Sequence, residues 1–171
     1  MKITLSGKSG CGNTTVSKLI AEKLNIKFIN YTFRNMAEEK GIKIEELAVL
    51  AQKDVSYDIF LDNNQKELAS KGNCVVGSRL AIWLIEDADL KVFLRAPVEV
   101  RAARIHMREG GSYDEVLKKT IERDKRDTER FIQIYNIDNN NYSHSDIIID
   151  TVFCSAEMAA DIIAEKVKSM L

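Results

Sequence analysis

Residues 7–14 read Gly-Lys-Ser-Gly-Cys-Gly-Asn-Thr and join an apolar run to a segment with apolar residues at helical spacing. The phosphate-binding loop pattern is Gly, four residues, Gly, Lys and then Ser or Thr. Gly7, Gly12 and Thr14 match it. Glycines let successive backbone N–H groups face one anion, and the helix start adds positive potential. The residues expected to surround the phosphates are Gly7, Lys8, Ser9, Gly10, Cys11, Gly12, Asn13, Thr14 and Thr15.

The rest of the chain alternates short apolar runs with amphipathic segments. Strands are expected at residues 2–6, 26–29, 74–76, 90–94 and 146–150, with helices between them. This alternation favours a parallel sheet covered on both faces, which is a three-layer α/β fold. The 171 residues contain one proline and no linker-like stretch, so a single domain over residues 1–171 is expected.

The composition excludes several classes of protein. The formal net charge is −1, so overall charge predicts neither nucleic-acid nor membrane partners. Cys11, Cys74 and Cys154 lack the spacing of a zinc site, and reduced, buried thiols are expected. No run approaches the ~20 apolar residues that a membrane span requires. These features favour a cytoplasmic protein.

Asn13 stands where the loop pattern has lysine. Asparagine can donate a hydrogen bond to a phosphate but carries no charge, and losing one preorganised donor typically costs ~10²–10³ in rate. We expect Lys8 to supply the missing charge, so Lys8 and Asn13 are candidate catalytic residues. The hydroxyl of Thr14 is the candidate ligand for Mg²⁺. The third strand is followed by no acid, and Gly77 stands at its end. A glycine-rich turn that binds nothing is the simpler alternative.

Arginines are the second signal, because a permanently charged guanidinium binds phosphate in a bidentate manner. Arg79 follows the third strand, at the edge where parallel sheets bind ligands. Two helical faces carry the sets Arg101, Arg104 and Arg108, and Arg123, Arg126 and Arg130. Each arginine alone fits a solvated charge or a local ion pair. Together, on either side of Gly110-Gly111, they predict a mobile lid that closes on a nucleotide, with Arg123 and Arg126 as candidate catalytic residues.

Ordered stretches along essentially the whole chain resemble the cytidylate kinases, and most closely their short archaeal-type branch. The stretches are residues 7–15, 33–37, 62–65, 79–81 with Trp83, 88–91, 96–97, 100–101 with Arg104, 108–110, 122–123, 137–138 with Tyr135, and 146–151. The resemblance implies transfer of the γ-phosphate of ATP to CMP or dCMP. It also implies Mg²⁺ as cofactor and a monomeric enzyme.

The resemblance further implies roles for particular residues. Arg34 and Arg79 match arginines that hold the acceptor phosphate, and Asp62 falls in the acceptor region. Arg104 and Arg108 resemble lid residues that face ATP. Arg123, Asp127 and Arg130 look like acceptor and lid contacts. An acceptor-binding insertion is implied at about residues 32–71 and a lid at about residues 104–130.

Three alternatives stay open. Asn13 and Gly77 favour a nucleotide-binding protein that has lost catalysis, whereas the arginines argue against it. Another small acceptor, such as UMP, AMP or a shikimate-like molecule, would use the same loop. RNA binding through the arginines is opposed by the acids at positions 122, 124, 127 and 129.

Overall fold

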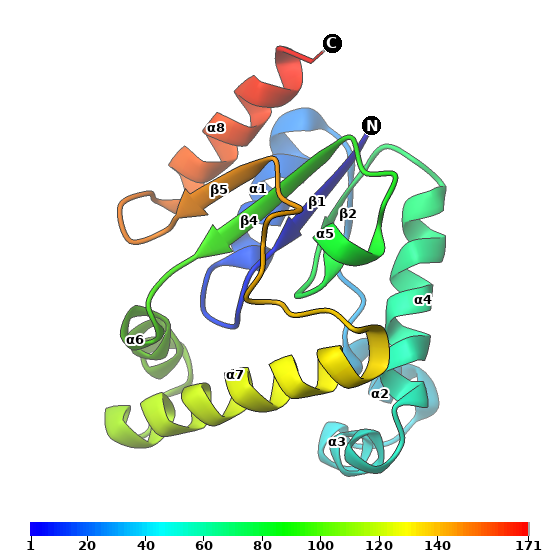
Figure 1. Cartoon of the computed structure of the whole chain (residues 1–171), viewed down its shortest axis with the longest axis vertical. Helices are drawn as coiled ribbons and strands as arrows, with labels where there is room; N and C mark the ends of the chain where they lie inside the picture. Colours follow the sequence, from blue (N-terminus) through cyan, green and yellow to red (C-terminus); the bar gives the residue numbers. More distant parts are fainter. Residues whose placement is uncertain (171) are drawn as a thin grey trace.

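The alternating apolar runs fold into one parallel sheet. The computed structural model describes residues 1–170, apart from the side chain of Ala48 (Figure 1). The strands are β1 (Lys2–Ser6), β2 (Lys27–Ile29), β3 (Cys74–Gly77), β4 (Leu90–Arg95) and β5 (Ile147–Asp150). They lie in the order β2-β3-β1-β4-β5, and every neighbouring pair is parallel. All five predicted strands are confirmed to within one residue at each end.

Seven helices lie between these strands and an eighth follows β5, within residues 1–170. They are α1 (Asn13–Leu24), α2 (Phe33–Lys40), α3 (Ile44–Lys53), α4 (Ser56–Ser70), α5 (Ala81–Leu84), α6 (Val98–Glu109), α7 (Tyr113–Tyr135) and α8 (Ala156–Lys168). The single turn of α5 is too short for periodicity to reveal. None of the described helices is both long enough and apolar enough to cross a membrane.

Alternate side chains of the strands build the two faces of the sheet. Val75 lies in a core cluster with residues of α1 and α8. Its neighbours Cys74 and Val76 face the other way, into a cluster with residues of α4 and α5. The sheet is therefore covered on both sides, and the predicted three-layer α/β fold is confirmed.

Helix α7 is the least buried of the long helices. It spans 23 residues, packs along α6, and buries only Thr120 and Phe131 among its residues. Figure 1 shows it crossing below the sheet from α6 towards the α2–α4 region. Side-chain hydrogen bonds and ion pairs therefore supply much of its attachment to the rest of the molecule, and these pairs surround the site described next.

Candidate active site

The loop after β1 is shaped by two glycines and by the helix packed behind it. Gly10 and Gly12 have φ angles of 86° and 99°, in the left-handed region, and α1 begins at the next residue, Asn13. A Cβ at Gly10 would lie 2.8 Å from the backbone oxygen of Arg101, so α6 leaves room for glycine alone. The loop and the start of α1 thus have the conformation expected of an anion-binding turn.

Asn13 braces this loop from the inside. Its Nδ2 atom donates a hydrogen bond of 2.6 Å to the backbone oxygen of Gly7, and its Oδ1 atom is buried without a hydrogen-bond partner. The Asn13 side chain therefore bridges the first and last parts of the loop, and its amide nitrogen already donates to Gly7. Phosphate contact by Asn13, with a catalytic role, stays a prediction.

Lys8 lies at the rim of the loop, on the side that faces α7. Its ammonium donates a hydrogen bond of 2.7 Å to Asn140 Oδ1 and lies 3.9 Å from Asp124 Oδ2. Lys8 can reach a phosphate bound at the loop only if its ammonium turns away from these two partners.

Asp124 of α7 joins the loop to the helix pair through a second cation. Arg101 of α6 is 3% exposed and donates to both carboxylate oxygens of Asp124, at 3.2 and 2.6 Å. The same guanidinium donates to the backbone oxygens of Ser9 and Ala96, each at 3.1 Å. Arg101 is therefore a buried brace between the loop, α6 and α7.

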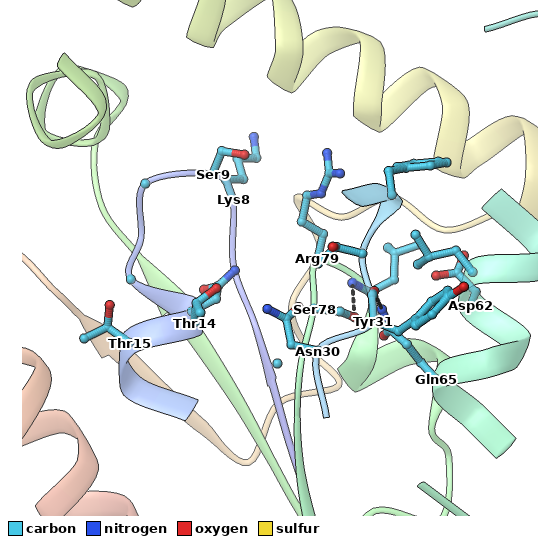
Figure 2. Close-up of a pocket in the computed structure, with 18 of the residues that line it drawn as sticks. Lys8, Ser9, Thr14, Thr15, Asn30, Tyr31, Asp62, Gln65, Ser78 and Arg79 are labelled. Carbon is cyan, nitrogen blue, oxygen red and sulfur yellow. Dashed lines mark hydrogen bonds between the residues drawn. The ribbon is translucent and has the colours of Figure 1, made fainter. Parts of the chain in front are cut away.

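A cavity of about 440 Å³ runs from the loop to helix α4. In Figure 2, Thr14 and Thr15 lie at one end, Arg79 near the middle, and Asp62 and Gln65 at the other end. The predicted site residues that line it are Lys8, Ser9, Gly10, Gly12, Asn13, Thr14, Thr15, Asp62, Arg79, Arg104 and Arg108. The loop, the third strand and the predicted acceptor region therefore meet in one space.

The other predicted site residues do not line this cavity. Cys11 is buried, and Arg34, Arg123 and Arg126 are exposed on α2 and α7. Arg126 lies 4.0 Å from Asp127. The roles assigned to these three arginines stay predictions, and each of the three has to move to touch a ligand in the cavity.

Two further predicted residues, Asp127 and Arg130, do not line the cavity themselves. Each pairs with a residue that does. Asp127 accepts a hydrogen bond from Arg79, which also lies 6.0 Å from the ring centre of Phe131. Arg130 donates to Asp58 of α4. These pairs neutralise arginines that would otherwise repel one another, and they orient Arg79 at the end of β3.

Helix α4 contributes three polar residues at helical spacing, Asp58, Asp62 and Gln65, all buried and all in the cavity wall. Asp62 accepts a hydrogen bond of 2.6 Å from the hydroxyl of Tyr135, and burial raises the pKa of its carboxyl to about 6. Gln65 Nε2 donates to the backbone oxygen of Tyr31 at 2.7 Å. The opposite end of the cavity from the loop is thus polar and preorganised.

A second cavity, of about 480 Å³, lies on the other side of the loop. It is lined by Cys11, by the start of α1 and by the segment 151–156, and it shares Gly12, Thr15 and Arg104 with the first cavity. Arg104 is held there by hydrogen bonds of 2.9 and 2.5 Å to Thr151 and of 3.2 Å to the backbone oxygen of Gly10. The phosphate loop therefore separates two spaces that can hold two ligands.

The donor atoms near the loop suit a metal held mainly by phosphate. Within residues 1–170, no three His, Cys, Asp or Glu side chains gather in a way that could hold a metal ion. Thr14 places its hydroxyl in the cavity wall at the start of α1. One protein oxygen together with phosphates and water is a ligand set that Mg²⁺ accepts.

Sequence reasoning missed part of the cavity wall. Asn30, Asp58 and Ser78 line it, and none of them was assigned a role. Gln65 lay in a stretch that carried the resemblance, but no role was assigned to it either. The spacing of Asp58, Asp62 and Gln65 on one helical face was the available signal, since three polar residues are unusual at buried positions.

A parallel sheet with a phosphate loop after its first strand, and two cavities meeting at that loop, defines a P-loop kinase fold. A shikimate kinase from Bacteroides thetaiotaomicron superposes with a TM-score of 0.66 at 18% identity, over 98% of each chain. The family described as cytidylate kinase-like matches residues 2–152, and this chain belongs to that family.

Several relatives cover almost the whole chain, two of them as follows. Cytidylate kinase 2 of Borrelia garinii is 45% identical over 98% of this chain and 96% of its own. The cytidylate kinase of Methanocaldococcus jannaschii is 38% identical over 99% of both. The expected family is confirmed.

Proposed function

We propose that this chain transfers the γ-phosphate of ATP to CMP or dCMP, giving ADP and CDP or dCDP. The observation that carries the proposal is the pair of cavities that share Gly12, Thr15 and Arg104 at the phosphate loop. One cavity suits the base of the phosphate donor. The other runs past Arg79 to the polar wall of α4 and suits a nucleotide acceptor. The names of the relatives supply the acceptor, cytidylate.

The transfer requires an acceptor oxygen to approach the γ-phosphorus in line with the bond that breaks. An oxygen of the acceptor phosphate forms the new P–O bond, and ADP leaves with the electron pair of the old one. Arg79 fits the acceptor phosphate, and the backbone N–H groups from Gly10 to Thr14 fit the donor phosphates. Mg²⁺ would be held by the Thr14 hydroxyl and the phosphates, and it neutralises charge on them. We further infer, from the sequence and family, a monomer that acts in the cytosol on small nucleotides.

Lys8 is the residue that would replace the missing loop lysine. If its ammonium leaves Asn140 and Asp124 for the γ-phosphate, it adds the charge that Asn13 lacks. We expect Lys8→Ala to lower kcat with CMP by ~10²–10³ while leaving the fold intact. Lys18→Ala, an exposed change on α1, is the matched control and should leave kcat unchanged.

The test measures ADP formation from ATP and Mg²⁺ with CMP, dCMP, UMP and AMP. Turnover that is fastest with CMP or dCMP supports the proposal, and turnover that survives Lys8→Ala removes only the role of Lys8. Tight ATP binding with no turnover on any acceptor would instead identify a nucleotide-binding protein without catalysis. The retained Arg79 and acceptor cavity argue against that outcome.

A further inference from the structure

The amide of Gln65 is fixed in one orientation by the backbone. Gln65 is 4% exposed and lies in the cavity wall, one helical turn after Asp62. Its Nε2 atom donates to the backbone oxygen of Tyr31, in the segment between β2 and α2. That oxygen can only accept, so rotating the amide by half a turn would set two acceptors against each other. The contact therefore determines which end of the amide stays available.

The available end is the side-chain oxygen. Within the described residues, Gln65 Oε1 accepts no hydrogen bond, and it is not completely shielded from solvent. It is therefore an acceptor that remains open to the cavity. Figure 2 shows Gln65 beside Tyr31 and near Asp62, at the end of the cavity away from Thr14 and Thr15. A nucleotide whose phosphate lies near Arg79 would place its base at this end.

We propose that Gln65 is the residue that makes the acceptor site select bases with an exocyclic amine, so that cytosine is preferred to uracil. The proposal rests on the proposed function, and it identifies the residue that sets the base preference of that reaction. Cytosine carries an amine at C4 that can donate to Oε1. Uracil carries a carbonyl oxygen there, and the fixed amide would face it with a second acceptor. Both oxygens would be left without a donor in a buried site, which is costly.

The neighbours of Gln65 suit a base but do not distinguish the two pyrimidines. Phe33, Leu61 and Phe131 also line the cavity and supply apolar surface for a ring. Asp62 is held by the Tyr135 hydroxyl, and its free carboxyl oxygen can accept a hydrogen bond. An ionised carboxylate can accept from the C4 amine of cytosine or from N3–H of uracil, and a protonated carboxyl can also donate to N3 of cytosine or to O4 of uracil, so Asp62 can pair with both bases. The Gln65 amide differs, because its hydrogen bond to the Tyr31 backbone oxygen prevents its donor and acceptor ends from changing places.

The experiment compares kcat/KM for CMP and UMP in the wild type, in Gln65→Leu and in Gln65→Glu. Leucine keeps the bulk and removes the acceptor, so the CMP-to-UMP ratio should fall about tenfold or more. Glutamate loses the donor to the Tyr31 oxygen and should cost stability, but both of its side-chain oxygens accept, so the folded variant should still prefer CMP. Gln52→Leu, at an exposed position on α3, is the matched control and should keep the wild-type ratio. An unchanged ratio in a folded Gln65→Leu protein overturns the inference.

A measurement on the wild type alone guards against a variant that fails to fold. The monophosphate of pyrimidin-2-one, which lacks the C4 amine, should be a poorer acceptor than CMP by about tenfold or more. Equal kcat/KM for the two would overturn the role of the amine and hence of Gln65. Binding of CMP and UMP by calorimetry separates the two proposals. CMP turnover with no preference rejects the inference alone, whereas absence of both binding and turnover with CMP rejects the proposed function as well.

Discussion

The packing around Gly77 explains why this chain lacks the acid that P-loop enzymes usually have at the end of the third strand. Gly77 stands at the end of β3, where that acid would organise Mg²⁺. A Cβ at Gly77 would lie 2.5 Å from Ser17 Oγ and 3.3 Å from the ring of Phe28. Ser17 is fully buried in α1, so the helix has packed into the space that a side chain would need. Thr14 is therefore left as the protein's candidate metal ligand beside the loop.

Asp62 gives a prediction at the same scale. Burial raises its pKa from 3.8 to about 6, so the folded chain binds this proton more tightly than the unfolded chain. The stability from this group is complete below pH 3.8 and is lost as the pH rises through 6. Relative to Asp62→Asn, the wild type should lose about 2 kcal/mol of unfolding free energy between pH 4 and pH 7. Urea unfolding at several pH values measures this.

The control for Asp62 is an exposed carboxylate. Glu22 lies on the surface of α1, so Glu22→Gln should shift the stability equally at pH 4 and pH 7. In Asp62→Asn, the asparagine side chain keeps an oxygen that can accept from the Tyr135 hydroxyl. A pH dependence identical in wild type and Asp62→Asn would show that Asp62 is not buried as the structure has it.

At the scale of elements, the contact between the loop and α7 runs through one carboxylate. Asp124 pairs with the buried Arg101 and lies near Lys8, and Arg101 holds the backbone oxygen of Ser9. The sequence predicted arginine faces on α6 and α7 directed at nucleotide. Arg101 instead points between the two helices and the loop, because its partner Asp124 comes from α7. It is a positioning residue for the loop.

Removing that carboxylate should leave the buried Arg101 guanidinium without a counter-ion. We expect Asp124→Ala to lower the unfolding free energy by about 3–5 kcal/mol, which is the usual cost of breaking a buried ion pair from one side. Chemical denaturation measures the loss. Glu122→Ala removes an exposed acid two residues earlier on the same helix and should change stability by less than about 0.5 kcal/mol. Equal losses of stability in the two variants would contradict the stabilising role of the Arg101–Asp124 pair.

At the scale of the whole molecule, the helix pair α6–α7 is attached more weakly than the layers around the sheet. The sheet and helices α1 and α8 share one continuous apolar core. Helix α7 buries two residues, and it contacts α4 and the segment after β3 through Asp58–Arg130, Arg79–Asp127 and Asp62–Tyr135. An element with few buried apolar contacts opens at lower free energy than the core. This arrangement supports the predicted lid between residues 104 and 130.

Hydrogen exchange tests the lid on the intact protein. Amides of α7 should exchange faster than those of β1 and β4, because local opening precedes global unfolding there. Adding ATP, Mg²⁺ and CMP together should slow exchange in α7 more than in α8, which lies on the far side of the sheet from α4 and α5. Protection in α7 equal to that in β1, with no change on adding nucleotides, would exclude a mobile lid.

The sequence alone determined the strands, most of the helices and the phosphate loop, because each depends on neighbours within a few residues. The resemblance of the ordered sequence stretches indicated the cytidylate kinase family, and the match to that family over residues 2–152 confirmed it. Only the tertiary structure decided which groups meet. Gln65 and the Tyr31 oxygen are 34 residues apart, Arg101 and Asp124 are 23 apart, and Asp58 and Arg130 are 72 apart. Such pairs depend on the strand order and on how the helices pack, and local periodicity does not encode either.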